Sequence, residues 1–177
     1  MIEVRPAVPS DALPLSLFGA RTFRDAFAAE NRPENLEAFL AKAYGVPQQS
    51  GEIADASVAT LIAEANGDMV GFAQLRGGVT PSCVIGPHPI ELWRFYVARE
   101  WHGRGVASKL MASVVTEAFR RGARTLWLGV WERNGRAQAF YRKCGYLVVG
   151  QQPFVLGNER QTDLVMARPV SQPAGVA

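Results

Sequence analysis

The stretch Val97-Ala98-Arg99-Glu100-Trp101-His102-Gly103-Arg104-Gly105-Val106-Ala107 decides how this chain of 177 residues folds and what it can bind. The run from Glu91 to Val97 before it is rich in β-branched and aromatic side chains, which predicts a strand. The apolar positions after it repeat with helical spacing, which predicts a helix. The loop between them carries two glycines, which let the backbone approach a ligand closely. Because the first N–H groups of a helix lack partners within the helix, this junction predicts an anion site, although a tight turn without any ligand explains it equally well.

A second stretch, Asn134-Gly135-Arg136-Ala137-Gln138-Ala139-Phe140-Tyr141-Arg142-Lys143-Cys144-Gly145-Tyr146, predicts a helix that lies beside this loop. Asn134 suits the N-cap, and Gly145 suits the position just after the last turn. Tyr141 follows Asn134 by seven residues, so the two share one side of the helix. A phenol with a pKa of about 10 can protonate a thiolate, whose thiol has a pKa of about 8.5, only when it is held close to the sulfur. Taken alone, Tyr141 is as well explained by core packing.

The rest of the chain predicts an α/β fold with a mixed sheet covered by helices. Hairpin turns are predicted at Asn66-Gly67-Asp68 and at Gly157-Asn158. The predicted strands are 2–5, 58–64, 69–75, 91–97, 125–131, 146–151 and 162–166. The predicted helices run from an N-cap at Ser10-Asp11 to about Asn31, from Pro33 to Gly45, from Val106 to Arg121, and from Asn134 to Gly145, while 48–57 shows no clear pattern.

Composition favours one small domain, which we place at 1–170 with a flexible tail at 171–177. Hydrophobic residues make up 48% of the chain, but no apolar run reaches the roughly 20 residues of a membrane span. The N-terminus, Met1 to Pro6, lacks the apolar run of a signal peptide, so we expect a soluble cytoplasmic protein without membrane contact. The net charge is +3 and the arginines are scattered, which argues against nucleic acid as a partner. Cys83 and Cys144 are too few for a disulfide framework, and we expect no metal.

These two stretches resemble motifs of the GNAT superfamily of N-acetyltransferases, which use acetyl-CoA. The helix has the pattern Asn-x-x-Ala-x-x-Phe-Tyr-x-Lys-x-Gly-Tyr, and the loop is similar to the family's Gln/Arg-x-x-Gly-x-Gly/Ala, with His102 at the first position and Ala107 at the last. The likeness covers about 90–150 and implies a single domain with a central, mostly antiparallel sheet flanked by helices. Dimers through the C-terminal strands are common in this family, and the oligomeric state stays open.

The resemblance also implies where acetyl-CoA would bind. Its pantetheine would lie along Phe95, Tyr96 and Val97 as an added strand, and Asn134 and Tyr141 would face the pantetheine and the sulfur. The pyrophosphate would sit on the loop and the helix start. The residues assigned to that loop are His102, Gly103, Arg104, Gly105, Val106, Ala107 and Ser108.

The reaction we expect is direct attack of a primary amine on the thioester, with a backbone N–H near Val97 stabilising the oxyanion and Tyr141 protonating the leaving thiolate. Glu91 is the candidate base, although a glutamate facing solvent explains it nearly as well. Phe27, Glu30, Tyr44 and Glu91 are candidates for the acceptor pocket, and Asp25 and Glu132 for further carboxylates near its mouth.

Three further segments narrow the likeness to polyamine acetyltransferases of the PaiA type, which implies a polyamine acceptor. They are Thr22–Phe27 with Asn31–Asn35, Trp127–Glu132, and Gly157–Asp163. Amino-acid-like amines, antibiotic amines and protein N-termini are the competing acceptors. A non-catalytic protein that binds acetyl-CoA or a polyamine is the rival from another class.

Overall fold

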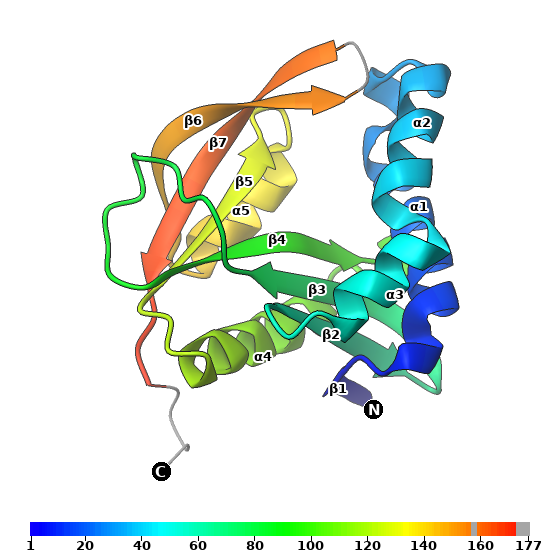
Figure 1. Ribbon diagram of the computed structural model, residues 1–177, viewed down its shortest axis with the longest axis horizontal. Helices are drawn as coiled ribbons and strands as arrows, with labels where there is room; N and C mark the ends of the chain where they lie inside the picture. The colour runs from blue at the N-terminus through cyan, green and yellow to red at the C-terminus, as the bar shows by residue number, and fades with distance from the viewer. Residues whose placement is uncertain (157–158, 173–177) are drawn as a thin grey trace.

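A seven-stranded sheet forms the centre of the molecule in the computed structural model, which describes residues 1–156 and 159–172 (Figure 1). The strand order is β1-β2-β3-β4-β5-β7-β6, and β4 and β5 form the parallel pair among otherwise antiparallel neighbours. This confirms the predicted α/β fold with a mixed, mostly antiparallel sheet. The strands are β1 (Ile2–Pro6), β2 (Val58–Ala65), β3 (Asp68–Arg76), β4 (Pro89–Val97), β5 (Thr125–Trp131), β6 (Leu147–Leu156) and β7 (Glu159–Pro169).

Five α-helices flank this sheet. They are α1 (Ala12–Phe27), α2 (Pro33–Tyr44), α3 (Val46–Ala54), α4 (Val106–Arg120) and α5 (Gly135–Lys143), with short 3-10 turns at Pro9–Asp11, Ala28–Glu30 and Arg99–Trp101. α4 and α5 pack on one face, and α1, α2 and α3 pack on the other. We call these the α4 face and the α1 face. Two hydrophobic clusters follow this division, one under α4 and α5 and one between α1, α2 and Phe72.

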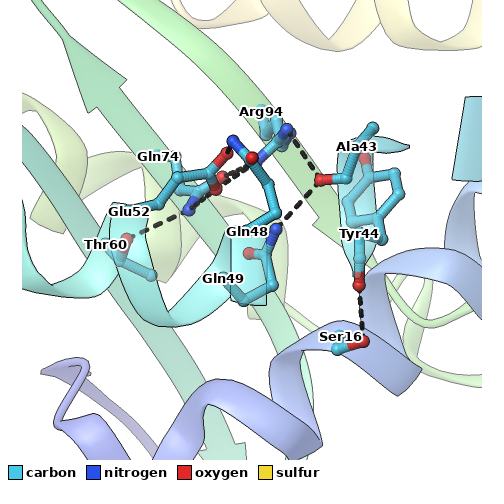
Figure 2. A network of polar contacts seen from close by, with 9 residues as sticks. All are labelled: Ser16, Ala43, Tyr44, Gln48, Gln49, Glu52, Thr60, Gln74 and Arg94. Atoms are coloured by element: carbon cyan, nitrogen blue, oxygen red, sulfur yellow. Dashed lines mark hydrogen bonds and ion pairs between the residues drawn. The ribbon is translucent and has the colours of Figure 1, made fainter. Parts of the chain in front are cut away.

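Helix α3 is the element that the sequence pattern did not reveal. Its buried residues are the polar Gln49 and Glu52, so the apolar spacing that marks most helices is missing. Both residues belong to a polar network that joins α3 to the α1 face of the sheet (Figure 2). Arg94 of β4 donates to Glu52 Oε2 at 2.5 Å, to Gln74 Oε1 at 2.6 Å and to the Ala43 carbonyl at 3.0 Å. Polar contacts of Gln49 and Glu52 therefore bind the buried side of α3, and the partly buried Ile53 adds an apolar contact with the cluster between α1, α2 and Phe72.

Other boundaries differ from the prediction for local reasons. α1 ends at Phe27, four residues earlier than predicted, where Asn31 Nδ2 donates to the Phe27 carbonyl at 2.8 Å. The predicted cap at Asp11 makes no side-chain bond to α1, because its carboxylate accepts from Arg5 and from Val8 N–H. β6 and β7 extend beyond their predicted ends, and β6 accommodates Pro153 because it is an edge strand. The predicted turn at 157–158 and most of the predicted tail, 173–177, lie outside the described residues.

The sheet splits between its two parallel strands. β4 and β5 pair at three positions, Pro89 with Thr125, Ile90 with Leu126 and Glu91 with Trp127, and beyond them the strands diverge. A bulge in β4 accompanies the split, because Gln74 pairs with Arg94 and Leu75 with Leu92, so Trp93 has no partner on β3. The edge of β4 from Trp93 onward therefore lacks a strand on its β5 side.

Candidate active site

The open edge of β4 presents backbone groups to the split. Ala98 N–H donates to the Val70 carbonyl at 2.9 Å, so by the alternation of an antiparallel pair the N–H and C=O of Val97 point away from β3. Phe95 lies two residues earlier and has the same orientation. The ring of Tyr96 lies on the α1 face, where it stacks on Phe72 with centroids 5.6 Å apart. Phe95 and Val97 thus present their backbone groups at the open edge, whereas the backbone groups of Tyr96 point toward β3 and its ring lies on the α1 face.

The glycine loop ends at the start of α4 with free backbone donors. Gly103 and Gly105 have φ of +76° and +83°, a left-handed conformation that explains both glycines. A Cβ at either position would meet nothing within 4 Å, so the space in front of the loop is open. Lys109 N–H is bonded to the Gly105 carbonyl, and no hydrogen bond is found, in the part of the chain that the structure describes, for the N–H groups of 106–108. The loop thus has the backbone conformation and the unbonded N–H groups on which the prediction of an anion site depends.

His102 links three elements around the split. Its Nε2 lies 3.0 Å from the Val97 carbonyl, and its Nδ1 lies 2.8 Å from Arg136 Nη1 at the start of α5. Since a carbonyl only accepts and a guanidinium only donates, these partners assign the proton to Nε2 and a lone pair to Nδ1. The His102 side chain is therefore occupied within the protein and holds the end of β4 against α5.

Tyr141 lies on the α4 face at the split. Its ring is 8% exposed and packs edge-on against Phe95 and Tyr146, with centroids 6.2 Å and 5.7 Å away. Burial raises the pKa of Tyr141 well above its usual range. No hydrogen bond to its hydroxyl is found among the described residues, whereas the Tyr146 hydroxyl donates to Met111 Sδ at 3.9 Å. The protonated phenol therefore has its hydrogen available for a ligand.

The predicted N-cap of α5 is confirmed, because Asn134 Oδ1 accepts from Ala137 N–H at 3.1 Å. Arg104 in the glycine loop is exposed, with its guanidinium 5.5 Å from the centre of the Trp101 ring. Arg120 and Arg121, the arginines at the other end of α4, are both bound to Glu117. Among these three arginines, Arg104 is the one at the open loop.

The α1 face carries an aromatic and charged hollow beyond the end of β5. Phe27 of α1 lies 5.9 Å from the Trp131 ring. A hollow of about 310 Å³ is lined by Glu30, Trp131, Glu132, Arg133, Glu159, Arg160, Gln161 and Thr162. Of the predicted acceptor residues, Phe27 and Glu30 thus border one region, and Glu132 joins them.

The structure does not bring Tyr44 and Glu91 into that hollow. Tyr44 is 2% exposed under the Arg94 guanidinium, and burial raises its pKa to about 12. Glu91 accepts from Arg76 Nε at 2.6 Å, at the last residue pair before the split. Asp25, another candidate carboxylate, is exposed on α1.

Asp163 of β7 is a carboxylate that the sequence reasoning did not single out. It pairs with Trp131 on β5 and Gln152 on β6, on the α1 face. Burial, together with the charge of Glu132, raises its pKa to about 6. The signal that could have revealed it is the alternation of β7, in which Asp163 shares a face with Val165 and Ala167.

In the ranges 1–156 and 159–172, no group of three or more His, Cys, Asp or Glu is arranged to hold a metal ion. Both cysteines are free thiols. No helix in the same ranges is long and apolar enough to cross a membrane.

The sheet splits at a parallel strand pair, and a glycine loop with N–H groups unbonded in the described residues leads into α4; this arrangement fits the class of acyl-CoA-dependent acyltransferases that the two sequence motifs resemble. Residues 22–146 match the Acetyltransferase (GNAT) family. The chain is 34% identical over 159 residues to an uncharacterized N-acetyltransferase of Mycobacterium bovis, covering 90% of this chain and 97% of that protein. It is 30% identical over 147 residues to one of Lactobacillus delbrueckii subsp. lactis, covering 83% and 85%.

Solved structures share the fold. The PaiA N-acetyltransferase of Thermoplasma acidophilum, crystallised in complex with coenzyme A, superposes with a TM-score of 0.78 at 20% identity, over 96% of this chain and 99% of that one. With the family match and the relatives above, the conclusion is direct. The chain belongs to the acetyltransferase (GNAT) family and is an acetyl-CoA-dependent N-acetyltransferase.

Proposed function

We propose that this enzyme acetylates a primary amine of a small cationic molecule of the polyamine class. The observation that carries the proposal is the split between β4 and β5, which has the phenol of Tyr141 on its α4 face and the hollow beside Trp131 on its α1 face. The hollow is lined by three carboxylates, Glu30, Glu132 and Glu159, and by the two guanidiniums of Arg133 and Arg160, and this excess of negative charge suits a cationic amine. The similarity in fold to a PaiA enzyme supports the same class of acceptor.

The residues around the split fit the acetyl donor. The unbonded N–H groups of 106–108 and the positive end of the α4 dipole suit a pyrophosphate, with Arg104 beside them. The open edge at Phe95 and Val97 suits the amide groups of pantetheine, and the side-chain NH₂ of Asn134 is left free by its cap. Gly103 and Gly105 leave the approach to the loop open. Acetyl-CoA supplies an activated acyl group with a thiolate leaving group.

The chain's own groups would then complete the transfer. A backbone N–H at the open edge near Val97 stabilises the charge that develops on the carbonyl oxygen. The phenol of Tyr141 gives its proton to the departing sulfur, which burial favours because it keeps the phenol protonated. Glu91, the base predicted from the sequence, is bound to Arg76 through one carboxylate oxygen, Oε2, at 2.6 Å, and would have to accept the proton on Oε1 or leave Arg76.

A thiol-release assay over a panel of amines tests the proposal. We expect saturating rates with spermidine and much slower release with an amino-acid amine, an aminoglycoside and a peptide N-terminus. If only the peptide supports thiol release, the acceptor is a protein N-terminus and the proposal of a small cationic acceptor is wrong. Binding of acetyl-CoA in a calorimetric titration without any release would favour the non-catalytic alternative.

A further inference from the structure

The covering of the α1 face has a gap at the split. The residues of β5 on that face are, in order, Trp127, Gly129 and Trp131. Trp127 is covered by Val84 of the loop before β4, and Trp131 is covered by Phe27 of α1. Gly129 lies between these two layers and has no side chain. A Cβ there would lie 3.1 Å from Asp163 Oδ2 and 2.8 Å from Gln152 Nε2, so these two polar groups fill the middle layer.

The place of this gap is set by the strand register. The last residue pair before the split is Glu91 with Trp127, and Gly129 lies two residues further along β5, about 7 Å at the usual rise per residue. The open edge of β4 from Trp93 to Val97 lies across the split. The Asp163 carboxylate lies next to Gly129 and is therefore close to the β5 side of the split.

Among the acids near the split, Asp163 and the exposed Glu132 are the two without a cation in the part of the chain that the structure describes. No ion pair or hydrogen bond to the Asp163 carboxylate is found over residues 1–156 and 159–172, whereas Glu91 is bound to Arg76 and Glu52 to Arg94. Glu30 lies 3.8 Å from Arg133, and Glu159 lies 3.8 Å from Arg32. A carboxylate that is largely buried and lacks a counter-charge lowers the stability of the fold, so its position at the split calls for a ligand.

We infer that Asp163 is the catalytic residue that receives the ammonium group of the acceptor and removes its proton. This inference rests on the proposed function and names the base for that same reaction. The ammonium ion gives one proton to the Asp163 carboxylate, and the free amine then forms a bond to the thioester carbon. The C–S bond breaks, and the thiolate takes a proton from Tyr141. The second proton of the original ammonium leaves the nitrogen as the amide forms and restores Tyr141, and Asp163 releases its proton to water.

The protonation behaviour of Asp163 agrees with this role. Its pKa of about 6 is high enough to accept a proton and low enough to leave the group ionised at neutral pH. Glu132 at the end of β5 raises it, and the neighbour on β6 is the uncharged Gln152. The other charged groups near this end of β5 are Glu30, Arg133, Glu159 and Arg160 at the hollow, and the loop before β4 presents Cys83 and Val84 to the sheet.

Asp163→Asn tests the inference, because it removes the charge and keeps the shape. At pH 7 we expect kcat/KM for spermidine to fall at least 100-fold, with the affinity for acetyl-CoA changed less than twofold. The deficit should shrink to less than about fivefold near pH 10, where the amine loses its proton without help. A folding defect would not recover in this way, and the melting temperature should not fall. Asp68→Asn, at the exposed first residue of β3, is the matched control and should behave like the parent protein.

The outcomes separate the two proposals. If the parent protein acetylates cationic amines and Asp163→Asn stays within threefold of it at pH 7, the inference is wrong and the proposed function stands. A deficit that persists unchanged at pH 10 also overturns the inference, because it points to a role in structure or binding. If the parent protein acetylates no amine in the panel, the proposed function fails and the inference fails with it.

Discussion

Strand β4 has one polar region on its α1 face and another along its open edge. The charged groups of the first region find their hydrogen-bond partners within the protein, whereas key groups of the second find none in the described part of the chain. In the network under α3, Glu52 accepts from Arg94, Gln74 and Gln48, and Arg94 donates in turn to Gln74 and Ala43 (Figure 2). At the split, the Tyr141 hydroxyl, the Asp163 carboxylate and the first N–H groups of α4 have no partner among the described residues.

This contrast separates the polar groups that stabilise the fold from those that take part in the reaction. A buried charge stabilises a fold only when the same fold supplies its partners. The charges of Glu52 and Arg94 meet that condition, although Gln49 Oε1 in the same network is buried without a hydrogen bond among the described residues. Removing either charge should therefore affect stability and leave the chemistry alone. The groups at the split do not meet that condition, so their removal should affect the chemistry and leave stability equal or higher.

The largest effect is expected in the closed network. Glu52→Gln leaves the buried Arg94 guanidinium without its counter-charge and should lower the free energy of unfolding by about 3–5 kcal/mol, measured by urea denaturation. Activity per folded molecule should not change. Glu37→Gln breaks the exposed pair with Arg24 and should leave the free energy of unfolding unchanged, because water screens that pair. A loss below about 1 kcal/mol for Glu52→Gln would remove the distinction between the regions.

The next effect is on catalysis. Tyr141→Phe should lower kcat about 100-fold, or roughly 2.7 kcal/mol in the barrier, because the thiolate loses its proton donor. Stability should change little, since the hydroxyl makes no bond within the described protein. Tyr146→Phe is the control, because that hydroxyl is bound to Met111 and should not matter to turnover. Unchanged thiol release by Tyr141→Phe would exclude Tyr141 as the acid.

A smaller effect concerns stability against pH. The folded-state pKa of Asp163 is raised from its ordinary value to about 6, so ionisation destabilises the fold, and the penalty grows as pH rises from about 4 through 6. Asp163→Asn should therefore be more stable than the parent by about 1–2 kcal/mol at pH 7.5, after allowance for partial exposure. The advantage should vanish near pH 4. Thermal unfolding at the two pH values measures it, and a variant that is less stable at pH 7.5 would contradict the unpaired state of this carboxylate.

The smallest effect concerns the donor loop. Arg104→Gln should weaken acetyl-CoA binding about fivefold, or roughly 1 kcal/mol, because one exposed cation near the pyrophosphate is lost. Arg120→Gln should leave binding unchanged, because that guanidinium is bound to Glu117 and lies at the other end of α4. Calorimetric titration compares the two. Equal losses would show that the arginines act through net charge alone.

The sequence predicts this fold well where local chemistry decides it. The cap at Asn134, the hairpin at Asn66-Gly67 and the two loop glycines each act on backbone within a few residues of themselves, so their positions could be predicted. Helix α3 could not be predicted, because the ion pair that allows Glu52 to be buried involves Arg94, 42 residues further along the chain. For the same reason the ion pair of Glu91 and the isolation of Asp163 are invisible in a linear pattern, since both depend on which strands are neighbours.

Because Trp93 sits in a bulge, β4 could be one residue shorter without changing which face its other residues occupy. Omitting Trp93 would leave Leu92 and Arg94 adjacent, with Leu92, Phe95 and Val97 still on the α4 face and Arg94 and Tyr96 still on the α1 face. Every apolar contact of the strand is thus compatible with a chain one residue shorter. The additional residue provides curvature, together with a ring that lies 3.8 Å from the Arg76 and Arg94 guanidiniums. Substitutions at Trp93 remove only the ring, so the contribution of the curvature would be seen only when the residue is deleted.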